Sequence, residues 1–317
     1  MHPTRNYSID SLKMFCAILV VLIHSQFLFK DIVFPLLRIA VPIFFMISGY
    51  FIYDNNAGKR INRSIKSIFS IFIWSNLLFL IFKEVFSIAH HAIYVPDTNE
   101  LLKFIVFNED PFGWHLWYIG AYLYLLVIVR FINKHNKWTL LFKSIPVLLI
   151  VHLALSYAGV DRIYYRNFLL MGLPFFSIGA YIRKTNIQSA STNKSFFCIL
   201  LFAIASIAEK QLTSLNSEIY VSTIFLSILI FICFVNWKQT KPSIVSWGGK
   251  EYSLDIYIFH GLFVLYFFPT LNGHCGIQWN RIYNSLSPVF ILGATLIFAV
   301  IYKKMKQLMF QSYINGK

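Results

Sequence analysis

Apolar segments alternate with short polar connections along most of the chain. Each apolar segment has about the 20 residues that a helix needs to cross the hydrocarbon core of a bilayer. The pattern predicts an all-α, polytopic membrane protein with about ten transmembrane helices, at roughly 11–29, 33–53, 67–88, 115–133, 139–157, 167–182, 195–209, 218–236, 251–269 and 284–302. The segments 167–182 and 195–209 are short for a complete crossing, so nine or eleven crossings stay open.

Composition agrees with a chain whose main solvent is lipid. Of its 317 residues, 57% are apolar and only 13% are charged, which is about half the charged share of an ordinary soluble domain. A water-soluble domain of this length needs a charged exterior that these residues cannot supply. Because no internal repeat or Pro/Gly-rich linker interrupts the chain, we interpret residues 1–317 as a single membrane domain. Its first apolar segment lacks a cleavage pattern and is predicted to be retained.

The net charge of +15 is distributed in a way that predicts the orientation of the chain. With the N-terminus in the cytoplasm, 20 of the 28 Lys and Arg residues fall in or beside the inner connections. Cytoplasmic loops of membrane proteins carry such an excess. We therefore predict an even number of crossings with the N- and C-termini cytoplasmic, and the same distribution argues against nucleic acid as a partner.

The cysteines and the longest connection add two smaller predictions. The connection at about 89–114 is predicted to face outward, and its stretch 99–107 has apolar residues at helical spacing, so we expect a helix along the membrane interface. The cysteines are widely separated and form no CxxC pair, so the sequence predicts neither a disulfide framework nor a metal site. They are Cys16, Cys198, Cys233 and Cys275.

Ionisable residues inside the predicted spans are candidates for function, because each is costly in lipid unless it is paired or faces water. In the first span, Lys13 and His24 are eleven residues apart, so they share one helix face about 16 Å apart along the axis. Lys13 is then at the inner mouth of the span. Arg38, in the second span, is predicted at nearly the depth of His24, where a guanidinium needs a water-filled cavity or a carboxylate.

The ninth span carries a second polar face. Ser253, Tyr257 and His260 recur at helical spacing, which places His260 near the midplane. Asp255 lies about 140° round the helix from His260. It is therefore expected to pair with a cation elsewhere.

Two further sets of residues lie near the ends of predicted spans. Arg60 and Arg63 are just inside the membrane at the start of the third span, where cations beside a helix N-terminus suit a phosphate group or anionic lipid heads. His115 and Trp117 are at the outer end of the fourth span, where an aromatic belt is expected in any membrane protein.

Six motifs, in this order along the chain, resemble those of the acyltransferase-3 family of integral-membrane acyltransferases. They are Lys13-x10-His24, Pro42-x-Phe-Phe-x-x-Ser48-Gly49-Tyr50, Arg60-x-x-Arg63, His115-Leu-Trp117-Tyr118, Pro174-Phe-Phe-x-x-Gly179 and Ser253-Leu-x-Ile-Tyr257-x-x-His260. The resemblance covers most of the chain, from Asp10 to His260. Two positions depart from it: Lys13 replaces the more usual Arg and lacks its bidentate fork, and Asp255 stands where many relatives have a small or apolar residue.

The resemblance implies a ten-helix enzyme of the bacterial cytoplasmic (inner) membrane. Such an enzyme moves an acyl group, usually acetyl from cytoplasmic acetyl-CoA, to a hydroxyl of a cell-surface glycan such as O-antigen or capsule, or of its lipid-linked precursor. Acyl-CoA, the glycan or its precursor and membrane lipid are the expected partners. No metal is expected, and homodimer formation stays open.

Residue roles follow partly from that resemblance and partly from chemistry. His24 is the expected general base or acyl carrier, because a largely neutral imidazole suits either role. Arg38 is a candidate for stabilising an oxyanion or orienting a glycan phosphate, and His260 completes the catalytic candidates. The expected acetyl-CoA ligands are Lys13, Ser48, Arg60 and Arg63, and the expected acceptor-binding residues are His115, Trp117 and Tyr257.

Each assignment has a plainer structural alternative. The two histidines would form hydrogen bonds between helices, and Arg38 would form an ion pair between helices. The inner cations would be orientation signals. The residues at the outer end of the fourth span would belong to the interfacial belt.

Two other classes of multi-spanning protein stay open. A transporter or flippase for a lipid-linked sugar or small solute would have broken helices and midplane charges, and this chain has some of both, without a repeat between its halves. A polysaccharide polymerase would present a larger outward loop than the roughly 25 residues predicted at 89–114. Transfer of label from acetyl-CoA to a glycan distinguishes the acyltransferase from both.

Overall fold

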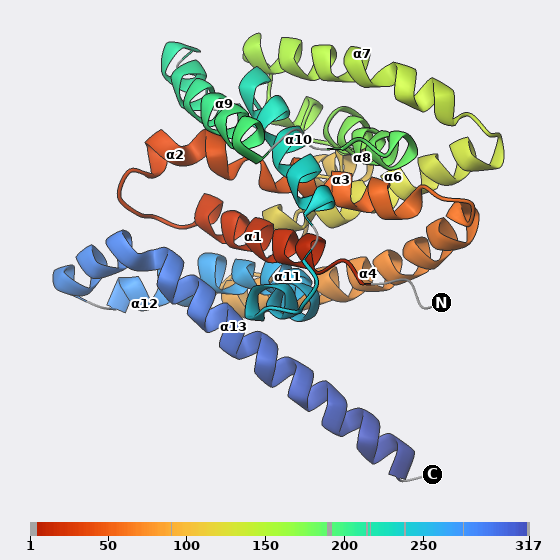
Figure 1. Ribbon diagram of the computed structural model, residues 1–317. Coiled ribbons are helices and arrows are strands. Elements are labelled where there is room, and N and C mark those ends of the chain that lie inside the picture. Colours follow the sequence, from red (N-terminus) through yellow and green to blue (C-terminus); the bar gives the residue numbers. More distant parts are fainter. Residues whose placement is uncertain are drawn as a thin grey trace. The chain divides into compact units, whose positions relative to one another are not determined.

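The computed structural model describes residues 5–89, 91–188, 192–213, 215, 217–237, 239–274 and 276–315, and Cys275 lies outside these residues. The described residues are almost entirely helical, which confirms the all-α fold (Figure 1). The chain forms two compact units: unit 1 consists of Met1–Asp31 and Thr240–Lys317, and unit 2 of Ile32–Gln239. The interpretation of the chain as a single membrane domain stays a prediction.

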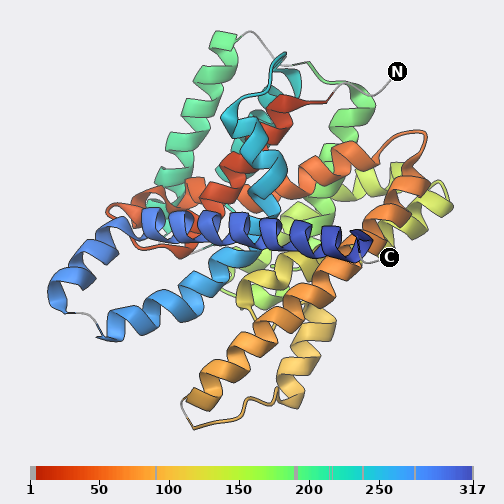
Figure 2. The ribbon, with the colours of Figure 1, turned by 90° about the horizontal axis from the view of Figure 1, so that it is seen from below.

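Unit 1 combines the first helix of the chain with its last ones. These are α1 (Tyr7–His24), α11 (Ile244–Leu262), the π-helical segment η4 (Phe263–Phe267), α12 (Phe268–His274) and α13 (Ile277–Asn315). α11, η4 and α12 follow one another without a break, and α13 leads the chain back (Figure 2). Phe259 of α11 packs against Phe298 and Tyr302 of α13, with ring centroids 4.9 and 5.2 Å apart.

Within unit 1, α1 and α11 pack backbone against backbone. A Cβ atom on Gly249 would lie 1.8 Å from the carbonyl oxygen of Asp10, so only glycine fits at this crossing. Gly249 lies beside Asp10, and His260 lies beside His24, so the two helices run in the same direction. Parallel spans begin on the same side of a membrane, which is what the predicted order requires of the first and ninth spans.

Unit 2 contains the remaining helices. They are α2 (Lys30–Leu37), α3 (Ala40–Ile52), α4 (Ala57–Ala89), α5 (Thr98–Phe107), η1 (Trp114–Leu116), α6 (Trp117–Lys134), α7 (Trp138–Tyr157), η2 (Arg162–Tyr164), η3 (Phe168–Gly172), α8 (Leu173–Thr185), α9 (Thr192–Thr213) and α10 (Val221–Asn236). α3 and α8 run in the same direction, because Gly172 lies beside Phe45 and Arg183 lies beside Tyr50, and they cross as closely as α1 and α11. A Cβ on Gly49 would lie 1.9 Å from the carbonyl oxygen of Phe176, and one on Gly179 would lie 2.0 Å from that of Met46.

The predicted helix at 99–107 is confirmed as α5. Asp97 and Glu100 form a capping box that starts this helix. α4 and α5 lie side by side as a hairpin (Figure 2), and the rings of Phe72 and Phe104 stack with centroids 5.7 Å apart. α5 has no buried residue and exposes several apolar side chains. Its place along the membrane interface stays a prediction.

In the described residues, eight helical stretches are long and apolar enough to cross a bilayer. They match eight of the ten predicted segments, and the other two correspond to η3 with α8 and to α10, which are shorter. The expected shortness of 195–209 is wrong, because this segment belongs to α9, which has 22 residues. The apolar segment stops where polar residues begin, but the helix continues through these polar residues at both ends. The number of crossings stays a prediction.

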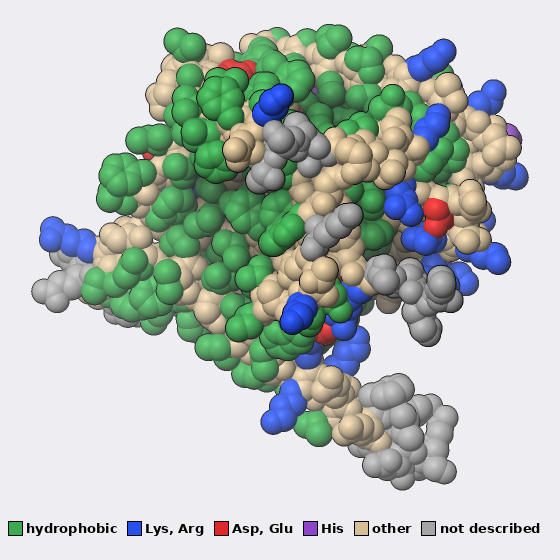
Figure 3. Space-filling view, in the orientation of Figure 1, with side chains coloured by type: hydrophobic (Ala, Val, Ile, Leu, Met, Phe, Trp, Pro, Cys, Tyr) green, Lys and Arg blue, Asp and Glu red, His purple; other side chains and the backbone are tan. Residues whose placement is uncertain are grey.

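Apolar side chains cover much of the surface seen in Figure 3, as contact with lipid requires. Lys and Arg side chains gather at its right-hand edge, where Figure 1 places the α3–α4 and α6–α7 connections of unit 2. The two connections lie together, because the rings of Tyr53 and Trp138 are 4.9 Å apart. Both are predicted to be cytoplasmic, and their common location agrees with that prediction.

Candidate active site

Two histidines from different helices stack in unit 1. His24 is the last residue of α1, and His260 lies two residues before the end of α11. Their ring centroids are 5.4 Å apart, and the rings are close to parallel, at 17°. His260 is completely buried and His24 is partly buried. The structure therefore brings together two of the predicted catalytic residues, whose roles stay predictions.

The backbone of α11 determines which nitrogen of His260 carries a proton. Nδ1 lies 2.7 Å from the carbonyl oxygen of Tyr257 and 3.1 Å from that of Ile256. Carbonyl oxygens only accept hydrogen bonds, so Nδ1 is the protonated nitrogen and Nε2 has the lone pair in the neutral ring. The Tyr257 ring packs beside this imidazole, with centroids 6.2 Å apart. Tyr257 is thus a neighbour of the histidine pair, and its role in acceptor binding stays a prediction.

Contacts just after α1 fix the position of His24. The Ser25 hydroxyl is buried and donates to the carbonyl of Val21 over 2.6 Å. The backbone N–H of Gln26 donates to the Ser287 hydroxyl of α13 over 2.6 Å, and this hydroxyl donates back to the Gln26 carbonyl over 2.7 Å. The end of α1 is therefore anchored to α13, and the His24 ring is held against His260.

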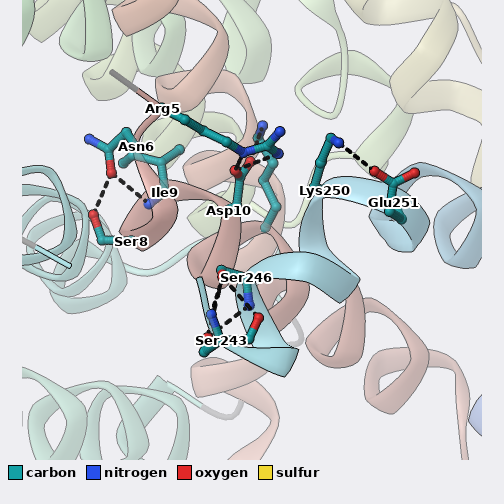
Figure 4. Close-up of polar contacts among 10 residues, drawn as sticks. Arg5, Asn6, Ser8, Ile9, Asp10, Ser243, Ser246, Lys250 and Glu251 are labelled. Atoms are coloured by element: carbon teal, nitrogen blue, oxygen red, sulfur yellow. Dashed lines mark hydrogen bonds and ion pairs between the residues drawn. The ribbon is translucent and has the colours of Figure 1, made fainter. Parts of the chain in front are cut away.

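The opposite ends of α1 and α11 are charged (Figure 4). The buried carboxylate of Asp10 pairs with Arg5 over 2.8 Å and with Lys13 over 3.1 Å. Two cations around one carboxylate leave a net positive charge at this end. Lys13 keeps about a third of its side chain exposed, at 31%. Lys13, which is predicted to bind the acyl donor, therefore already forms an ion pair with Asp10. The sequence analysis did not predict this pair.

Asp255 pairs with a cation, as expected. Lys303 of α13 lies 3.3 Å from the Asp255 carboxylate and 3.5 Å from that of Glu251, which also pairs with Lys250 over 2.8 Å. These pairs connect α11 to α13. The charge at position 255 is thus compensated within unit 1 and does not face the histidine pair.

The predicted donor ligands of unit 2 differ in their contacts. Arg60 pairs with Asp54 over 2.6 Å and donates to the Phe51 carbonyl over 2.7 Å, so it holds the turn between α3 and α4. Arg63 is exposed and forms no ion pair among the described residues. Ser48 donates to the Phe44 carbonyl of its own helix over 3.0 Å. Of the three, Arg63 has its charge most available for a phosphate.

Arg38 takes part in a buried ionic network that connects distant segments of unit 2. Its Nη1 lies 2.7 Å from Glu218, which is 6% exposed, and Arg166 is 3.8 Å from both Glu218 and Glu109. The Arg38 Nε is buried and makes no hydrogen bond within the described part of the chain. The ion pair that the sequence left open for Arg38 is present, and its catalytic role stays a prediction.

Electrostatics keeps the centre of this network ionised. Burial raises the pKa of Glu218, but the guanidinium groups of Arg38 and Arg166 outweigh it, so the pKa is below its usual range. Burial also lowers the pKa of Arg166, although Glu218 opposes this. The sequence analysis missed Arg166 and Glu218 because these residues lie at the edges of predicted segments. Arg166 directly precedes 167–182, and Glu218 is the first residue of 218–236.

His115 and Trp117 are both buried inside unit 2. The His115 ring packs against Phe79 of α4, with centroids 4.7 Å apart. Trp117 stacks under Arg166, whose guanidinium carbon is 5.3 Å from the ring centroid. Trp117 therefore adjoins the ionic network, whereas His115 is in aromatic packing, and acceptor binding by either stays a prediction. Within the described residues, no three His, Cys, Asp or Glu side chains are grouped to hold a metal.

A second buried carboxyl, Asp110, lies in the loop before η1. One of its oxygens accepts from the backbone N–H groups of Phe112 and Gly113, over 2.9 and 3.1 Å. Its other oxygen, Oδ2, is buried without a hydrogen bond, as is Oδ1 of the neighbouring Asn76. Burial raises the pKa of Asp110 to about 7, despite these hydrogen bonds and the charge of Lys83.

Comparison with known proteins identifies the family of the chain. A family profile described as an acyltransferase domain matches residues 6–304, which includes parts of both units. The chain belongs to the acyltransferase-3 family. Its apolar helices agree with an integral membrane protein.

Curated relatives of this chain are longer and carry the names of another activity. Two amino-acid racemases of Enterococcus faecalis are 24% and 28% identical to it, over 92% and 63% of the chain and 46% and 32% of their own lengths. A serine/alanine racemase of Enterococcus gallinarum is 22% identical over 81% of the chain and 40% of its own length. The chain thus spans less than half of the relatives that it matches. No solved structure matches it.

The family motifs occur on helices that pair in the structure. Gly49 and Gly179, which belong to two of them, provide the close crossing of α3 with α8. His24 and His260, which end two others, form the stacked pair of α1 and α11. Motifs far apart in the sequence therefore meet in pairs, one pair in each unit.

Proposed function

We propose that this acyltransferase moves an acetyl group from cytoplasmic acetyl-CoA to a hydroxyl of a cell-surface glycan or of its lipid-linked precursor. We place it in the bacterial cytoplasmic (inner) membrane. The observation that supports this most is the stacked pair of His24 and His260 in a chain whose family is an acyltransferase family. An imidazole buried among helices is a suitable base for activating an alcohol.

In this proposal, His24 takes the proton of the acceptor hydroxyl as its oxygen attacks the thioester carbonyl. The new C–O bond forms, the C–S bond breaks, and the proton passes to the departing CoA thiolate, so atoms and charges balance. His260 positions His24 by ring stacking, because its own orientation is held by the α11 carbonyls. The carbonyl end of α1 at His24 stabilises the imidazolium that forms in between.

The donor and the acceptor are proposed to use different cations. The net positive charge around Asp10 and the exposed Arg63 suit CoA phosphates, which are polyanionic. Arg38 and Arg166 are balanced by Glu218 and Glu109, and Arg38 retains one buried N–H donor. This group suits the hydroxyl-rich part of an acceptor.

The racemase names do not alter this proposal. Those proteins are more than twice as long as the matched portion, so their printed activity belongs to chains with much additional sequence. We do not propose racemisation for this chain.

The decisive experiment compares histidine variants in membranes supplied with labelled acetyl-CoA. His24→Ala should reduce transfer of label to extracted glycan by about 100-fold or more, which is the usual contribution of a general base. His135→Ala is the matched control, because this histidine is exposed at the end of α6, and it should transfer normally. Unchanged transfer by the His24 variant would remove the catalytic assignment. No transfer with any acyl donor, together with substrate uptake, would support a transporter.

Substitutions of the donor cations should change affinity rather than chemistry. Arg60→Gln with Arg63→Gln should raise the KM for acetyl-CoA by about tenfold, because charge-assisted contacts to phosphate are lost, while kcat stays nearly constant. Lys59→Gln with Lys66→Gln removes two charges from the same region and is the control. A large fall in kcat at an unchanged KM would contradict donor binding by these arginines.

A further inference from the structure

A groove in unit 2 lies between α7, α8 and α10. It has a volume of about 710 Å³, and its walls are almost entirely apolar, including Leu149, Leu153, Ile224 and Ile228. Lining residues extend from Thr139 to Leu153 along α7, which corresponds to about 21 Å of helix. We refer to it as the α7–α8–α10 groove.

The only cations that line the α7–α8–α10 groove within the described residues are Lys143 and Lys184. Lys184 lies over the Phe142 ring at 5.1 Å, and this ring packs against Tyr181 at 5.4 Å, so the two lysines are at the same end. The far end, near Leu153 and Ile224, is apolar. The groove therefore has a cationic end and an apolar body.

Two observations place the cationic end at a membrane surface. Trp138 stacks on Phe142 at this end, and Trp is typical of the interface between lipid and water. Lys134 and Lys137 of the adjoining α6–α7 connection are among the cations that predict a cytoplasmic location. Along the outer side of α7, Leu140 and Val147 are at least 60% exposed, as expected for residues that face lipid.

We propose that the α7–α8–α10 groove binds an anionic phospholipid. Its phosphate lies between Lys143 and Lys184, and an acyl chain extends along the apolar body. Charge complementarity supports this occupant, because basic pockets between membrane helices bind anionic lipid head groups. A zwitterionic lipid would gain the apolar contacts but not the net attraction, and a free phosphate would lack the contacts with the apolar body. The proposal is independent of the acyl-transfer reaction.

The experiment measures lipid binding to the delipidated full chain in detergent by native mass spectrometry. Phosphatidylglycerol should bind about tenfold more tightly than phosphatidylcholine with the same acyl chains. Lys143→Gln with Lys184→Gln should abolish this preference. Lys134→Gln with Lys137→Gln is the matched control, because these two lysines are at the same end but do not line the groove, and it should keep the preference.

A second pair of variants tests the acyl chain. Ile150→Trp places a large ring in the groove, whereas Val147→Trp adds the same ring at a similarly exposed position of α7 outside it. The first should weaken phosphatidylglycerol binding about tenfold and the second should leave it unchanged. Glycerol phosphate, which has no acyl chain, should not compete.

Three results would overturn the proposal. They are equal binding of the two lipids, an equal loss in both lysine double variants, and full competition by glycerol phosphate. Because every readout is binding, these results do not depend on whether the chain transfers acetyl groups. Monodisperse elution of each variant shows that it has folded.

Discussion

At the scale of single residues, the chain places several ionisable groups where water cannot solvate them, and each has a different compensation. Glu218 stays charged because Arg38 and Arg166 flank it. Asp110 has no such partner close by and holds its proton more tightly instead. Burial alone therefore does not determine the charge of a buried carboxyl. The neighbouring side chains do.

Asp110 should make the stability of this protein depend on pH. Its pKa is about 7 in the folded chain against 3.8 ordinarily, so the folded state binds more protons between these values. Stability should consequently fall as the pH rises from 4 to 7. Asp110→Asn imitates the protonated carboxyl and should remove this part of the fall.

Thermal unfolding of the purified chain at pH 5 and pH 8 checks that prediction. The melting temperature of the wild type should decrease more between the two pH values than that of Asp110→Asn. Asp97→Asn changes an exposed carboxyl that caps α5, and it should follow the wild type. Parallel decreases in wild type and Asp110→Asn would show that Asp110 is already ionised at pH 5.

At the scale of helices, glycine determines which pairs approach most closely. Side chains normally keep helix axes 8–10 Å apart. At Gly249, Gly49 and Gly179, the missing Cβ allows a backbone carbonyl of the partner helix to occupy its place. These crossings hold the helices that carry the catalytic candidates and the motifs of the family.

Gly249→Ala should separate α1 from α11. The added Cβ would meet the Asp10 carbonyl at 1.8 Å, a contact with backbone that no rotamer relieves. We expect a loss of stability of about 3 kcal/mol or more and, because His24 and His260 then lose their stacking, a fall in transfer.

The control for this substitution is Gly293→Ala in α13. No atom lies within 4 Å of the Cβ that it adds. It should be neutral or stabilising by up to about 1 kcal/mol, because alanine favours a helix more than glycine does. Melting temperatures in detergent compare the two variants. Equal effects would mean that the crossing tolerates a side chain.

At the scale of the whole molecule, the distribution of charge predicts how the chain lies in the membrane. Lys303, Lys304 and Lys306 directly follow the last apolar segment, 284–302, so we predict a cytoplasmic C-terminus. The parallel course of α1 and α11 agrees with the same predicted order of spans.

Reporter fusions in a bacterial host check this orientation. Alkaline phosphatase should be inactive when fused after residue 317 and active when fused within the α4–α5 connection, at residue 96, because the enzyme matures only outside the cytoplasm. Green fluorescent protein should give the opposite result. An active phosphatase at the C-terminus would require an odd number of crossings or a reversed chain.

The sequence by itself determined the fold class, the helical segments and the family. Apolar runs of membrane length and the spacing of a few motif residues are local properties, so they can be read without coordinates. The short segment at 167–182 corresponds to η3 and α8, whereas the ends of α4, α9 and α13 were missed, because these helices continue into polar sequence.

Only the tertiary structure decided which of those residues meet. The stacking of His24 on His260 depends on a crossing at Gly249, and the charge of Lys13 is shared with Asp10. Arg38 forms an ion pair with Glu218, which is 180 positions away in the sequence. The physical reason is that a partner's identity depends on close packing between helices, which the hydrophobic pattern of each helix does not encode.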